Sequence, residues 1–154
     1  RVSRGLGDVY KRQGVSVGLG TDGFGLDMLG ELTAATLLCR HSAQDAEAGF
    51  EELPRALFES NAAFAGRIFG TELGVLRPGA AGDVIVLDYA PPTPLTAHDL
   101  DAHLIAASGL ARVTSTVSAG KLLMQDRVLL VADEEKLLEG ARKQAADLWR
   151  RVNA

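Results

Sequence analysis

A short apolar run near the start of the chain, Val15 to Gly20, most constrains the fold, because nothing else in the sequence looks able to pair with it. Its letters, VSVGLG, predict a strand that is buried on both faces rather than half exposed. A strand of this kind needs parallel partners, and the rest of the chain offers helices and a separate β-rich stretch. The run therefore predicts a larger sheet whose other strands lie outside this sequence.

Asp22 follows that predicted strand, with glycine on both sides of the Thr-Asp pair in GLGTDG. In a barrel of parallel strands, catalytic groups collect at the carboxyl ends of the strands. Burying an ionised carboxylate is costly without a strong partner, and a divalent metal supplies one. Asp22 is thus the candidate catalytic and metal-binding residue. The six residues alone favour the plainer alternative, in which Asp22 is a helix cap or turn residue.

The remaining periodicity predicts four helices and several short strands. The helices are expected over 27–41, from about 53 to 69, around 99–107 and over 133–152, with Asp27 capping the first. Strands are expected at 75–76, 84–87, 113–118, 122–124 and 128–131, with turns at Pro78-Gly79 and Ala119-Gly120. The order is one strand, two helices, a small β-rich module and a closing helix.

The first thirteen residues, RVSRGLGDVYKRQ, show neither strand nor helix periodicity. They resemble the translated sequencing-adapter tails found on metagenomic gene fragments. We therefore predict that 1–13 is a non-native tail and that the natural gene extends upstream of Gly14. The alternative is a natural N-terminal arm, whose four basic residues form a solvated tail.

Composition excludes several classes of function. The 154 residues are 47% hydrophobic, which is enough for one core of ordinary domain size. A net charge of −4, with acids and bases mixed along the chain, argues against nucleic-acid binding. No apolar run approaches the roughly 18 residues of a membrane span, and the N-terminus lacks the apolar core of a signal peptide. We expect a soluble, cytoplasmic protein with neither nucleic-acid nor membrane partners.

The histidines and the single cysteine have structural interpretations. His41 lies at a predicted helix C-terminus, where a cation is favoured, and His98 follows a proline-rich loop. His103 is predicted to be a packed histidine, with a contact between module and barrel as the alternative. No two of them have the spacing of a metal site. Cys39 has no partner for an internal disulfide and is expected to be a small, buried apolar residue.

Three segments, in order, resemble the amidohydrolase superfamily in its deaminase and chlorohydrolase branch. They are the GTDG strand end, the helix start DMLGELTAATLL, and the stretch NAAFAGRIFG-TELGVLRPGAAGDVIVLDY. The later part is similar to the SsnA-like aminohydrolases, through DYAPPTPL at 88–95, the turn VSAGK at 117–121 and the LWRR helix. The resemblance runs from Val15 to the end, and its specificity rests on the ordered succession of motifs.

The resemblance implies an α/β fold that is the C-terminal portion of a metal-dependent hydrolase. Residues 14–71 correspond to the end of a TIM barrel, with its last strand and following helices, 72–131 to part of a composite β-sandwich, and 132–154 to a C-terminal helix. The parent enzyme is expected to hydrolyse non-peptide C–N bonds, as an aminohydrolase or deaminase acting on a nitrogen heterocycle, an amidine or a guanidine. It is expected to bind a divalent metal, zinc or iron, through Asp22 and through histidines outside this sequence.

The family's His-x-His pair, its further histidines and its proton-shuttling glutamate have no counterpart in this sequence. The chain alone is therefore expected to be inactive and to bind no metal, and no residue is assigned to another cofactor. The alternative function is a noncatalytic binding or subunit-assembly module, and a homo-oligomer is compatible with either. A nucleotide-binding doubly wound domain is disfavoured, because GLGTDGFG lacks the G-x-G-x-x-G spacing and no βαβ repeat follows.

Overall fold

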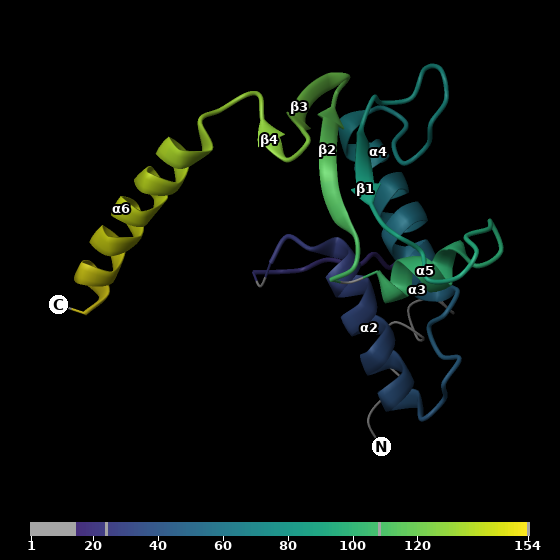
Figure 1. Ribbon diagram of the computed structural model, residues 1–154. Coiled ribbons are helices and arrows are strands. Elements are labelled where there is room, and N and C mark those ends of the chain that lie inside the picture. Colours follow the sequence, from purple (N-terminus) through teal and green to yellow (C-terminus); the bar gives the residue numbers. More distant parts are fainter. Residues whose placement is uncertain (1–14, 24, 108, 154) are drawn as a thin grey trace. The chain divides into compact units, whose positions relative to one another are not determined.

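The computed structural model describes residues 15–23, 25–107 and 109–153, and every structural statement below refers to these residues. The predicted tail at 1–13 lies outside them. The chain divides into two compact units (Figure 1). The first holds the described residues up to Ala81 together with Asp88–Arg112, and the second holds Gly82–Leu87 and the residues from Val113 onward.

The first unit begins with helix α2 (Met28–Ala43), which confirms the helix predicted over 27–41. The Asp27 carboxylate caps it by accepting a hydrogen bond from the Gly30 N–H at 3.0 Å, as expected. Leu32 and Thr36, one turn apart, are completely buried. The Thr36 hydroxyl avoids an unpaired state by donating to the Leu32 carbonyl oxygen at 2.7 Å.

The second helical segment runs through three elements in succession, α3 (Glu52–Arg55), the π-helical turn η1 (Ala56–Ser60) and α4 (Asn61–Phe69). The sequence predicts this segment as one helix, and the π-helical turn is an addition that periodicity did not reveal. Across it the Asn61 N–H donates to the carbonyl oxygen of Ala56, five residues earlier. Gly70, at a φ of 67°, ends the segment in the left-handed conformation that glycine adopts readily.

Helix α5 (Leu100–Ala106) confirms the short helix predicted around 99–107 and packs against α2 (Figure 1). The Thr33 hydroxyl of α2 donates to the Ile105 carbonyl oxygen of α5. Ile105 and Ala107 are buried beside this contact. The apolar core of the first unit therefore lies where α2 meets α5.

The predicted strand at Val15–Gly20 is wrong: these residues form no regular strand, and Val15 and Val17 are 48% and 40% exposed. A parallel strand is stable only when neighbouring strands take its backbone hydrogen bonds. The described chain supplies no such neighbours, so the segment is held by a side chain instead. Asn61 takes both backbone hydrogen-bonding groups of Leu19.

The predicted strand at 75–76 is also wrong. The Pro78-Gly79 turn is present, with the Ala80 N–H donating to the Arg77 carbonyl oxygen at 3.2 Å, but it does not join two strands. The Ala81 N–H reaches back to the Glu72 carbonyl oxygen, and the side chains of Glu72 and Arg77 form an ion pair. These contacts close residues 72–81 into a loop in place of the predicted hairpin.

The second unit contains a four-stranded sheet in the order β1-β2-β3-β4, which confirms the strands predicted at 84–87, 113–118 and 122–124, and the first half of the strand predicted at 128–131. Its members are β1 (Val84–Asp88), β2 (Arg112–Ser118), β3 (Lys121–Gln125) and the short β4 (Val128–Leu129). The β2–β3 and β3–β4 pairs are antiparallel. Ala119 and Gly120 connect β2 to β3 with φ values of 49° and 75°, the left-handed pair typical of a tight hairpin turn.

Helix α6 (Glu134–Val152) confirms the closing helix. Asp133 caps it by accepting from the Lys136 N–H at 3.2 Å. The hydrogen bond from the Lys136 side chain lowers the pKa of Asp133. Apolar side chains of α6 are exposed, with Trp149 61% accessible. Within the described ranges, no helix has the length and apolar character needed to cross a bilayer.

Gly49 provides a test of the packing between α2 and the second helical segment. It has a φ of 79°, and an added Cβ would lie 2.8 Å from Leu53 Cδ1 and 3.1 Å from Cys39 Sγ. We predict that Gly49→Ala lowers the free energy of unfolding in urea by about 1–2 kcal/mol for the backbone conformation, and by about 1–3 kcal/mol more for overpacking. Gly70→Ala is the matched control, because its φ is also positive but its Cβ meets open space. Equal losses in the two variants would contradict the tight packing.

Candidate active-site segment

Asp22, the predicted catalytic and metal-binding residue, lies in a turn that follows the irregular segment 15–20. Its φ is 50°, a left-handed conformation that aspartate tolerates better than most residues. The side chain is exposed rather than buried against an apolar strand. The burial argument for a metal partner therefore does not apply to the described chain alone, and the role of Asp22 stays a prediction.

The structure connects this segment to α4 through Asn61, a residue that the sequence reasoning did not single out. Asn61 Oδ1 accepts from the Leu19 N–H at 3.2 Å, and Asn61 Nδ2 donates to the Leu19 carbonyl oxygen at 2.7 Å. Leu19 is three residues before Asp22 in the sequence. One signal was available, because asparagine is a poor helix former that favours hydrogen bonding to nearby backbone.

Metal binding needs more ligands than the described chain brings together. Among residues 15–23, 25–107 and 109–153, no group of three or more His, Cys, Asp or Glu side chains could hold a metal ion. Zinc sites in proteins use three or four protein ligands. Within the described ranges the residues therefore form no metal centre of this kind, and the metal-binding role of Asp22 stays a prediction.

His103 is a packed histidine, as the sequence predicts. It is 7% exposed, and both ring nitrogens face hydroxyl groups. Nδ1 lies 2.7 Å from the Tyr89 hydroxyl, and Nε2 lies 3.2 Å from the Thr93 hydroxyl. The Tyr89 and His103 rings also meet edge to face, with centroids 5.8 Å apart. This histidine joins the 89–93 segment to α5.

The other two histidines and the cysteine also have structural positions. His41 is exposed in the last turn of α2, and His98 is exposed in a loop, both as expected. Cys39 is a free thiol that is only partly buried, which corrects the expectation of full burial. It lies on α2 against the turn at Gly49.

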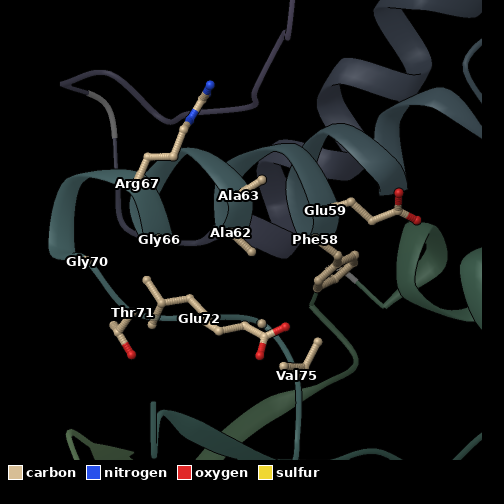
Figure 2. A pocket seen from close by; sticks show the side chains of 12 residues that line it. Phe58, Glu59, Ala62, Ala63, Gly66, Arg67, Gly70, Thr71, Glu72 and Val75 are labelled. Carbon is tan, nitrogen blue, oxygen red and sulfur yellow. The ribbon is translucent and has the colours of Figure 1, made fainter. Parts of the chain in front are cut away.

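A groove of about 610 Å³ lies between α4 and the segment that follows Gly70 (Figure 2). Its walls are mostly small or apolar, and Phe58 points from the helix toward Val75. Its charged residues are Glu59, Glu72 and Arg67, and the Arg67 side chain points away from the 71–75 segment (Figure 2). Neither Asp22 nor Asn61 lines it. The groove is therefore distinct from the candidate active-site segment.

Known proteins are similar to this chain in sequence and in structure. No family model matches the chain. A 5'-deoxyadenosine deaminase from Methanosarcina mazei is 35% identical over 161 aligned positions, which cover 100% of this chain and 36% of that protein. A 5-methylthioadenosine/S-adenosylhomocysteine deaminase from Pelotomaculum thermopropionicum is 38% identical, over 90% of this chain and 32% of the relative. A crystal structure of a Xanthomonas campestris adenosine deaminase with bound zinc superposes with a TM-score of 0.73 at 28% identity, over 91% of this chain and 33% of that one.

The mixed α/β chain with its small antiparallel sheet matches part of an adenosine deaminase structure, which agrees with the resemblance to the amidohydrolase superfamily. More particularly, the chain is homologous to the 5'-deoxyadenosine deaminases and to the 5-methylthioadenosine/S-adenosylhomocysteine deaminases. It spans about a third of the length of these relatives. The finer assignment to the SsnA-like branch stays a prediction.

The His103 cluster yields a prediction about stability. His103→Leu removes the partner of two hydroxyl groups in a partly buried site, so we expect the free energy of unfolding to fall by about 1–3 kcal/mol. His98→Leu is the control, because the side chain is exposed, and we expect a change within about 0.5 kcal/mol. Urea titration followed by circular dichroism measures both. A His103→Leu variant as stable as the control would show that the hydroxyl contacts contribute nothing.

Proposed function

We propose that the chain is the C-terminal part of a metal-dependent amidohydrolase that deaminates an adenosine-like nitrogen heterocycle. The observation that carries this proposal is the homology to deaminases of adenosine analogues, which extends over the whole chain at 35% identity. The reaction is hydrolysis of a C–N bond outside a peptide. The oxygen of water replaces the ring amino group, which leaves as ammonia.

In this proposal Asp22 has two roles in the complete protein. Its carboxylate is one metal ligand, and it accepts a proton from the attacking water. Asp22 lies in GTDG in an exposed turn, which leaves its carboxylate accessible to a metal ion and a substrate. Zinc is favoured over iron, because the Xanthomonas campestris adenosine deaminase holds zinc. The other ligands come from residues outside this sequence.

A second candidate is a noncatalytic assembly module that pairs subunits into a homo-oligomer. The exposed apolar side chains of α6 favour it, because contiguous exposed apolar surface marks interaction sites. Leu137, Leu148 and Trp149 are among them. The deaminase proposal explains the GTDG segment as well as the homology, and the assembly proposal explains only the helix.

A chimera tests the catalytic role of Asp22. Residues 15–153 replace the matching segment of the Methanosarcina mazei deaminase, and ammonia release from 5'-deoxyadenosine is measured. We predict that Asp22→Asn lowers kcat by about 10²–10⁴-fold, because the amide cannot accept the proton. Asp27→Asn is the matched control, because asparagine caps a helix as well as aspartate does. Full turnover and metal content in Asp22→Asn would refute the role.

The isolated chain gives a separate prediction about metal. One carboxylate is too few ligands for a zinc site, so equilibrium dialysis of the 154-residue chain against micromolar zinc should give well under one ion per chain. Tight binding of one zinc per chain would contradict this expectation and would place a complete metal site within the sequence.

A further inference from the structure

The contact between Asn61 and Leu19 has the form of a strand pairing. The side-chain amide accepts from the N–H and donates to the carbonyl oxygen of one residue, at 3.2 and 2.7 Å. A hydrogen-bonded residue pair between two antiparallel strands exchanges the same two bonds. Both bonds are partly buried, which limits competition from water. Asn61 thus makes the same two hydrogen bonds to the 15–20 segment that a residue of a neighbouring strand would make.

Gly18, directly before Leu19, has no side chain that would block the Asn61 amide. A Cβ added at Gly18 would lie 2.1 Å from Asn61 Oδ1, well inside any allowed separation. Gly18 is not among the residues with positive φ, so its backbone would accept alanine. Glycine at this position therefore serves to let the Asn61 amide approach the backbone.

The π-helical turn places Asn61 for the same contact. η1 ends at Ser60, directly before Asn61, and its extra residue rotates everything that follows by about 100° relative to a regular helix. Because Asn61 is the first residue after the rotation, the turn determines which direction its side chain takes. π-helical turns are frequent at functional sites, where they redirect a side chain.

We propose that Asn61 is a positioning residue that fixes Asp22 by holding the Leu19 peptide group, an inference that rests on the proposed catalytic role of Asp22. Only Gly20 and Thr21 separate Leu19 from Asp22, so the Asp22 Cα lies within about 11 Å of the Leu19 Cα, and its carboxylate is one short side chain further on. Without the amide, Gly20 leaves that link free to move. A displacement of about 1 Å at a reacting group costs on the order of 10²-fold in rate.

Hydrogen exchange in the 154-residue chain tests the contact itself. In Asn61→Ala, the Leu19 amide should exchange at least about tenfold faster by NMR, because its acceptor is gone. Gly18→Ala should accelerate exchange to the same extent, and the double variant should go no further, because both changes remove one contact. Gly20→Ala is the control, because its Cβ meets open space, and Leu19 exchange should stay unchanged. An unchanged Leu19 rate in Asn61→Ala overturns the proposal.

Kinetics in the chimera test the consequence. Asn61→Ala should lower kcat by about 10–100-fold and leave KM within about threefold, because it displaces Asp22 without touching substrate. Asn153→Ala, at the end of α6, is the matched control and should leave kcat unchanged. Faster Leu19 exchange with unchanged kcat overturns the positioning role. A wild-type chimera without deaminase activity overturns the proposed function and with it that role, while the exchange data still report the pairing separately.

Discussion

The account depends on one pair of hydrogen bonds, those between the Asn61 side chain and the Leu19 backbone. Among the described residues, no strand lies beside the segment that ends in Asp22, and its valines are exposed. Without hydrogen bonds to neighbouring strands, such a backbone is not fixed in one conformation. The Asn61 amide makes two hydrogen bonds to the Leu19 backbone like those of a paired strand residue. Leu19 lies three residues before Asp22. The position of Asp22 therefore depends on the helical segment.

That helical segment is itself shaped for the contact. The π-helical turn before Asn61 redirects the helix at the residue where the side chain is needed. The segment that follows α4 is held against that helix by close packing. An added Cβ at Gly74 would lie 2.6 Å from Ala62 Cβ, so the chain after α4 returns tightly along the same helix. The 89–93 segment is fastened in turn to α5 through His103. A few hydrogen bonds and close packing contacts around a small core thus hold much of the first unit together.

The regular elements could be predicted from the sequence because each has a local sequence signal, such as a helix cap or a turn. Asp27 caps α2 as predicted, and the hairpin turn predicted at Ala119-Gly120 has the left-handed residues that such a turn needs. The failures have a common cause. A strand at 15–20 and a strand at 75–76 are plausible from their apolar residues, but a strand exists only with partners, and partners are a property of the whole fold.

The candidate site shows the same difference between features that are local in the sequence and features that depend on the whole fold. Asp22 could be singled out from the sequence because it follows an apolar run in GLGTDG and because the wider sequence resembles the amidohydrolase superfamily. For Asn61 the only signal was an asparagine within a predicted helix, which does not identify its partner, because that partner is backbone 42 residues away. Long-range contacts of this kind leave no periodic trace. Asn61 and Gly18 are informative only when considered together.

The most direct measurement of the central claim is anomalous diffraction at the zinc edge from crystals of the zinc-loaded chimera. The account predicts an anomalous peak about 2.0–2.2 Å from a carboxylate oxygen of Asp22, with the Asn61 amide still paired to Leu19. A zinc peak that no oxygen of Asp22 reaches would contradict it and would leave Asp22 as a turn residue.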